Sequence, residues 1–148
     1  MHTYDSALKL VGVTVPEHLD AAAEVPILTG PQAQGDLLVV PEDPPPATRK
    51  QPATWTDVPA EGVQVVHGEA TGNTHWLHAG FDSPGVRWRR MEGGDLVLGY
   101  VQVPAGQSAL LIHTDEHGAN GIGPGTYAIR GKRELGLAVR AVERRVID

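Results

Sequence analysis

The stretch VVHGEATGNTHWLH, residues 65–78, holds three of the chain's seven histidines and one glutamate. A second group, LLIHTDEHG at residues 110–118, adds two histidines and two acids. Imidazole and carboxylate side chains together suit divalent Zn, Fe or Mn, provided that at least three of them converge. The two groups therefore predict a divalent-metal site with the candidate ligands His67, Glu69, His75, His113, Glu116 and His117.

Spacing limits which of these side chains can meet. On a strand, His67 and Glu69 are two residues apart and share a face, whereas His75 and His78 are three apart and point to opposite faces. A hairpin around ATGN would place His67 or Glu69 opposite His75 or its neighbours. Were the metal catalytic, Glu69 or Glu116 would be the general base toward a bound water. The alternative is a polar, solvated hairpin with no ligand.

Other chemistries lack their motifs. The chain has no cysteine, which excludes disulfides, thiolate metal sites and cysteine nucleophiles. Its serines lie outside any GxSxG turn, and GIGPG lacks the lysine and helix of a phosphate loop. The sequence therefore assigns neither a catalytic residue nor a reaction.

Charge is unevenly distributed along the chain. The net charge of −6 argues against general nucleic-acid binding. Acids predominate before residue 87 and bases after it, beginning with RWRR at residues 87–90. This polarity suits head-to-tail subunit contacts or an anionic partner, and the alternative is that these arginines lie on solvated strand faces.

Composition and patterning predict a mainly β fold. With 148 residues the chain makes one ordinary domain, and 18 glycines and 12 prolines favour turns and short elements. Short apolar or alternating runs separated by turn residues predict a small sandwich or partly open barrel. The predicted strands lie in residues 35–42, 63–69, 74–80, 85–91, 95–103, 108–114, 125–131 and 137–148, with GANGIGPG at 118–125 as a turn.

The N-terminal part has a different character. TVPEHLDAAAEV, residues 14–25, predicts one short helix, so residues 1–33 form a helical extension and residues 34–148 the β domain. Residues 41–59 hold six of the twelve prolines and predict an extended arm. Trp55 is the natural anchor of this arm, on a neighbouring subunit or on its own domain.

No targeting or membrane signal is found in the sequence. The N-terminus lacks the basic start and apolar run of a signal peptide, and no stretch approaches the twenty apolar residues of a membrane span. We therefore expect a cytoplasmic protein, or a virion component if the chain is phage-borne.

QGDLLVVP, HGEATGNTHWLH, HTDEHGANGIGPGTYAIRGKREL and RRVID follow one another in a single order. This order resembles a family of small uncharacterised bacterial and phage-borne proteins with the pattern QGD, GEATGH, EHG, PxGxY, RRVxD. The resemblance covers residues 34–148 and maps the family's recurring positions onto Glu69, His75, Glu116 and His117. Asn73 departs from the pattern, which has a histidine there.

Two functional hypotheses follow. In the first, the histidine and carboxylate groups bind a divalent metal, for structure or for simple chemistry. In the second, the chain is an oligomeric or assembly module, such as a component of a phage or mobile-element particle. The extended arm, the charge polarity and the lack of a complete catalytic motif favour the second.

Overall fold

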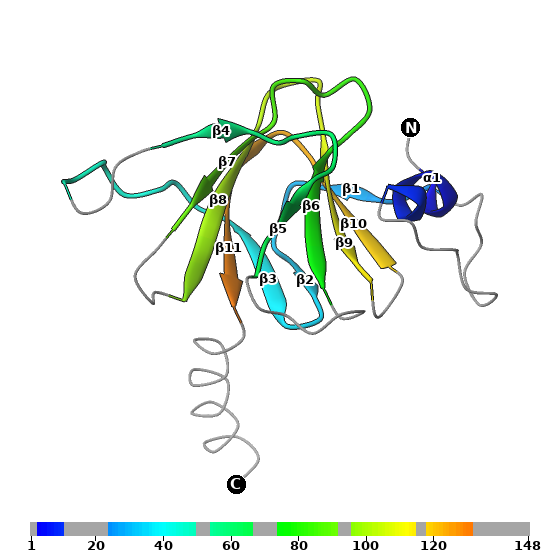
Figure 1. Ribbon diagram of the computed structural model, residues 1–148, viewed down its shortest axis with the longest axis horizontal. Helices are drawn as coiled ribbons and strands as arrows, with labels where there is room; N and C mark the ends of the chain where they lie inside the picture. The colour runs from blue at the N-terminus through cyan, green and yellow to red at the C-terminus, as the bar shows by residue number, and fades with distance from the viewer. Residues whose placement is uncertain are drawn as a thin grey trace, which may run out of the picture.

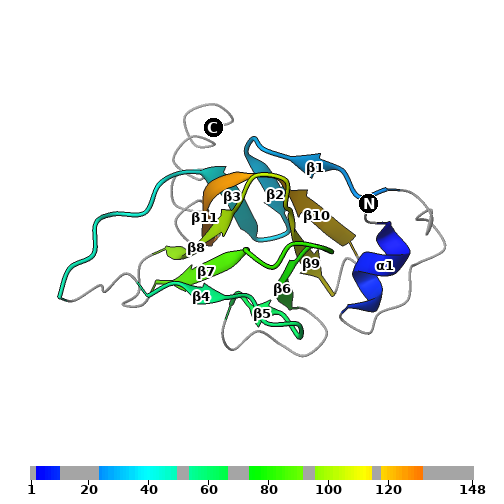
Figure 2. The ribbon, with the colours of Figure 1, turned by 90° about the horizontal axis from the view of Figure 1, so that it is seen from above.

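A computed structural model describes residues 3–10, 24–49, 54–66, 74–91, 96–114 and 118–131. Within these ranges the chain forms one helix and eleven strands, which build two sheets facing each other (Figures 1 and 2). The prediction of a mainly β sandwich with a short N-terminal helix is confirmed. The elements are α1 (Tyr4–Lys9), β1 (Ile27–Leu28), β2 (Gln32–Gln34), β3 (Leu37–Pro41), β4 (Thr56–Asp57), β5 (Val63–Gln64), β6 (His75–Ala79), β7 (Arg87–Arg90), β8 (Val97–Val103), β9 (Ala109–His113), β10 (Gly118–Ile122) and β11 (Gly125–Gly131).

The described strands divide into two layers of mostly antiparallel pairs. The five-stranded sheet has the order β1-β10-β9-β6-β5, and the six-stranded sheet has the order β2-β3-β11-β8-β7-β4. β1 pairs with β10 in parallel. Because the order interleaves distant segments, β6 and β9 become neighbours although the two histidine groups lie far apart in sequence.

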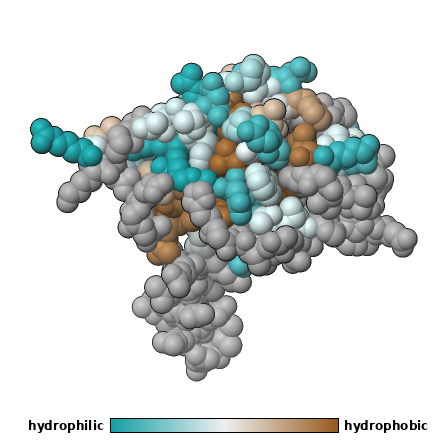
Figure 3. All heavy atoms as spheres, viewed as in Figure 1, coloured by the Kyte–Doolittle hydropathy of each residue, from teal (hydrophilic) through white to brown (hydrophobic). Residues whose placement is uncertain are grey.

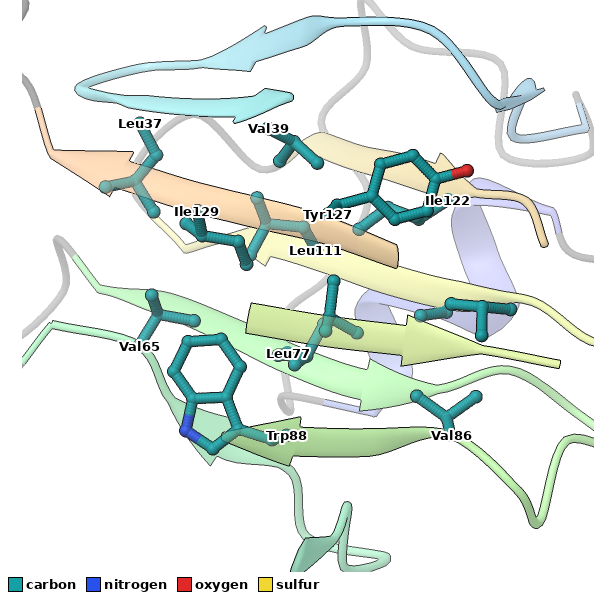
Figure 4. Close-up of a cluster of buried hydrophobic side chains, with 13 residues drawn as sticks. Leu37, Val39, Val65, Leu77, Val86, Trp88, Leu111, Ile122, Tyr127 and Ile129 are labelled. Carbon is teal, nitrogen blue, oxygen red and sulfur yellow. The ribbon is translucent and has the colours of Figure 1, made fainter. Parts of the chain in front are cut away.

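The core lies between the two sheets. Alternate residues of β3, β8 and β11 point inward from one layer, as Val39, Val101 and Ile129 do, and meet Leu77 and Leu111 from the other layer. All five side chains are fully buried. Figure 4 shows these layers converging, and in Figure 3 apolar surface is visible in the middle of the view, where the sheets face each other.

Polar side chains connect the two sheets along both sides of the sandwich. On one side, Gln34 of β2 donates to the carbonyl of Leu111 at 2.6 Å and to the side chain of Asn120 at 2.8 Å. On the other side, the guanidinium of Arg90 donates to the carbonyls of Val65 and Gln64 at 2.9 and 2.6 Å. These bonds satisfy the backbone carbonyls of Leu111, Val65 and Gln64.

Helix α1 covers the outer face of the five-stranded sheet. Thr3 and Ser6 form a capping box at its start, and Leu8 packs in a second apolar cluster with Leu110 and Ile112. Most of the helix predicted over residues 14–25, namely residues 14–23, lies outside the described ranges. Its described end is not helical, because Glu24 forms a β-bridge with Thr3.

The prediction of a turn at residues 118–125 was wrong for its first part, because Gly118–Ile122 forms strand β10. The glycines that suggested a turn allow another chain segment to approach closely. A Cβ atom on Gly121 would lie 2.5 Å from the carbonyl oxygen of Pro26 and 2.9 Å from the side chain of Ile27. Gly121 is therefore required where β1 joins the sheet.

Gly121→Ala is expected to lower the free energy of unfolding by about 1–3 kcal/mol, because the new methyl group displaces the backbone of β1. Urea denaturation followed by circular dichroism measures this change. Gly118→Ala is the matched control on the same strand, since a Cβ there meets nothing within 4 Å. Equal effects of the two substitutions would contradict the packing described for β1.

The proline-rich arm is extended in its described parts, as predicted. It leaves β3, extends away from the body of the sandwich (Figures 1 and 2), and rejoins the six-stranded sheet as β4, which pairs with β7. Trp55 is partly buried by its own chain. No described helix is long and apolar enough to cross a membrane.

Candidate functional site

Two of the six predicted ligands meet across neighbouring strands. His75 begins β6 and His113 ends β9, and the antiparallel register pairs the two residues directly. Their imidazole rings stack with centroids 4.1 Å apart and planes 9° from parallel. Strand pairing has thereby joined one histidine from each of the two groups seen in the sequence.

Alternation along the strands places both rings on the inner face of the five-stranded sheet. His75 shares its face with Leu77, and His113 shares its face with Leu111, both of which belong to the core. The two histidines are 2% and 4% exposed. They therefore form the polar end of the apolar layer between the sheets.

A threonine pair holds the strand ends beside the histidines. The backbone N–H of Thr74 donates to the hydroxyl of Thr114 at 2.9 Å, and the backbone N–H of Thr114 donates to the carbonyl of Thr74 at 2.9 Å. The indole N–H of Trp76 donates to the Thr74 hydroxyl at 3.0 Å. Sequence reasoning missed these threonines, although each is the residue immediately beyond its histidine at a strand end.

The other four candidate ligands, His67, Glu69, Glu116 and His117, lie outside the described residues. Among the residues that the structure does describe, no three histidines or acids form a group able to hold a metal ion. Two of the four, His67 and His117, are nevertheless adjacent to described residues. Val66 precedes His67, and Gly118, which follows His117, is the register partner of His113.

Strands β5 and β6 pair in antiparallel orientation, as the predicted hairpin requires, but their register differs from the one considered. Val63 pairs with Leu77, and the backbone N–H of Val65 donates to the carbonyl of His75 at 3.0 Å. The residue opposite His75 is therefore Val65 rather than His67 or Glu69. The cross-strand partner that supplies a second imidazole is instead His113.

His78 lies on the opposite face of β6 from His75, as its spacing predicts. It is 1% exposed, and its ring lies against Gly62, where an added Cβ would be 2.5 Å from Nε2. Burial lowers the pKa of His78 below its usual 6.5, and a hydrogen bond with the backbone of Ala60 partly offsets this shift. His78 is therefore a neutral packing residue rather than a member of the histidine pair.

The lowered pKa of His78 predicts a pH-dependent stability. Below pH 6.5 the unfolded chain takes up a proton at this position more readily than the folded chain does, so the free energy of unfolding falls as the pH falls. Above that pH the neutral ring carries no such penalty. Denaturant titrations between about pH 7 and about pH 5 should show a shallower decline for His78→Leu than for the wild type. Identical slopes would contradict the assignment.

The stacked rings also constrain how a metal could bind. An imidazole nitrogen binds zinc in the plane of its ring at about 2.0–2.1 Å. The planes of two nearly parallel, stacked rings do not intersect close to the rings, so one ion cannot lie in both ring planes. Joint coordination by His75 and His113 therefore requires the stack to open, whereas coordination by one ring alone does not.

Residues 33–132 match the family described as Domain of unknown function (DUF8820). Because the match covers more than half of the chain, the protein belongs to this family. The matched region contains both histidine groups and every strand from β3 to β11. No curated protein and no solved structure matches the chain significantly.

Proposed function

We propose that this member of the family binds a divalent metal ion at the end of the five-stranded sheet where β6 begins and β9 ends. The observation that carries the proposal is the direct pairing of His75 with His113, with rings 4.1 Å apart. Zn, Fe and Mn suit an imidazole and carboxylate ligand set, and the chain offers no thiolate. The metal would serve binding or structure rather than a defined reaction.

Connectivity supports completion of the ligand set by His67 and His117, with Glu69 and Glu116 in the same two segments. Thr74 and Thr114 are hydrogen-bonded to each other, and Val65 is bonded to His75, so three chain segments converge at this sheet end. From these points, residues 67–73 and 115–117 continue. Consecutive Cα atoms are about 3.8 Å apart, and His67 is two residues beyond Val65 while His117 is one residue before β10.

The chemistry of such a site would follow from its ligand count. A closed set of four ligands would give a structural site, whereas three ligands and one water would give an open one. In the open case the metal would acidify the water, and Glu69 or Glu116 would accept its proton. Because the two histidines are buried, they would exclude solvent from one side of a bound ion.

Zinc titration followed by imidazole nitrogen NMR tests the proposal. We expect stoichiometric zinc to shift the ring nitrogen signals of both His75 and His113. At least one ring becomes a zinc ligand, and the ring stacked on it either moves away or is polarised by the charge of the ion. The signals of His78 serve as an internal control, since that ring is buried on the opposite face. Unchanged signals of both His75 and His113 at excess zinc would contradict the proposal.

A second candidate function, homo-oligomeric assembly, is favoured by the exposed edge of the five-stranded sheet. β1 is the last strand in the described order of this sheet, and Ile27 and Leu28 are 46% and 47% exposed. Apolar edge strands favour pairing with another chain. The resemblance to phage-borne proteins fits a particle component, in the cytoplasm or in a virion, with protein rather than membrane or nucleic acid as the partner.

Light scattering after size-exclusion chromatography tests the assembly role. An oligomer that dissociates with Ile27→Lys but persists with Thr29→Lys, an exposed neighbour, would support it. A monomer at all concentrations in the wild type would exclude it.

A further inference from the structure

The most deeply buried charge in the described chain belongs to Arg89. It lies on β7 between Arg87 and Trp88 on one side and Arg90 on the other, and it is 2% exposed. Because Trp88 faces the core, the alternation of the strand turns Arg89 to the outer face of the six-stranded sheet. There its register partner is Tyr100 of β8, itself 4% exposed.

The hydrogen bonds of Arg89 satisfy only one edge of its guanidinium. Nη1 donates to the carbonyl of Pro45 in the proline-rich arm at 3.2 Å. Nε and Nη2 are buried and have no hydrogen-bond partner among the described residues. A permanently charged group held in this way is costly unless an opposite charge joins it.

Two carboxylates of the arm and β4 are bound to other arginines. Asp57 lies 3.5 Å from Arg87, and Glu42 accepts two bonds from Arg130 at 2.6 and 2.8 Å. Arg87 and Arg130, which are more exposed than Arg89, therefore have acidic partners. The buried one has none within the described residues.

The two unsatisfied donors have a specific geometry. In a guanidinium, the N–H bonds of Nε and Nη2 lie side by side and point in nearly the same direction. This edge matches two oxygens of a carboxylate or a phosphate, which it binds as a bidentate pair. The carbonyl of Pro45 fixes the orientation of the same plane through Nη1.

We infer that Arg89 is the centre of an anion-binding site beneath the proline-rich arm, where a carboxylate or phosphate group docks on its Nε and Nη2 edge. Because the side chain is covered, the ligand must displace part of its cover. The extended arm around Pro45 is the part of that cover that belongs to neither sheet. This site is separate from the histidine pair and does not depend on the metal proposal.

Anion titration of the full chain tests this site, with inorganic phosphate and acetate at low millimolar concentration as the two probes. At least one probe should raise the Tm of the wild type by several degrees and shift one arginine Nε–H signal in its NMR spectrum. Arg89→Lys keeps the charge but loses the bidentate edge, and it should lose this response. Arg87→Lys, on the same strand and face, should keep it.

The outcomes separate the two kinds of anion. A response to phosphate alone assigns a phosphate group, a response to acetate alone assigns a carboxylate, and a response to both supports the shared oxyanion chemistry. No response to either probe would overturn the inference, as would an equal loss of response in both arginine variants. The wild-type Nε–H signal decides the matter even if Arg89→Lys does not fold.

Discussion

Replacing Trp88 with alanine is expected to lower the free energy of unfolding by about 3–5 kcal/mol. Trp88 is 3% exposed, and its ring covers Gly99 so closely that a Cβ there would lie 2.3 Å from the indole. Its truncation would leave a cavity in the main core and remove the surface above which Arg90 lies, 5.4 Å from the ring centroid. A loss of this size is a large part of the stability of an ordinary domain.

Urea denaturation followed by far-ultraviolet circular dichroism measures this effect without relying on tryptophan emission. Trp55→Ala is the matched control, because Trp55 lies in the proline-rich arm and is only partly buried. We expect the control to cost less than about 1 kcal/mol. Comparable losses at both positions would show that the arm contributes to stability as much as the core does.

The second large effect concerns metal affinity. His113→Ala should weaken zinc binding by a factor on the order of 100 or more, because even residues that only orient a ligand change affinity by 10–100-fold. Competition titration with a chromophoric chelator measures the change. The expected result rests on the pairing of His113 with His75 at one sheet end.

His78→Leu is the control for that experiment, since it removes a buried imidazole from the opposite face of β6. We expect this variant to bind zinc as the wild type does, measured at a pH where both proteins are fully folded. Equal weakening by His113→Ala and His78→Leu would attribute the effect to stability rather than to ligation.

The sequence predicted the strands that have clear patterns. Short apolar runs bounded by turn residues located β3, β6, β7, β8 and β9, alternation located β5, and the turn residues around TYAIRG located β11. β1, β2, β4 and β10 were missed, because the glycines, prolines and glutamines in and around them are typical of loops. Their pairing is established by contacts such as that of Gly121 with Pro26, which depend on segments far apart in the chain.

The candidate site could be predicted as residue types but not as an arrangement. His75 and His113 were identified from their neighbours in sequence, whereas their stacking follows from the register of β6 against β9. Local patterning carries no information about such a non-local register. Arg89 was missed for a similar reason, since a run of arginines favours a solvated face unless the covering segment is known.

Elemental analysis of the untagged protein tests the metal proposal most directly. Mass spectrometry should find a nearly stoichiometric transition metal in the wild type and almost none in a His75→Ala, His117→Ala double variant of unchanged fold. Such a result would establish the site and would justify a search for hydrolytic or oxidative activity. A folded wild-type protein that contains no metal, and that takes up neither zinc nor iron when these are added, would contradict the proposal.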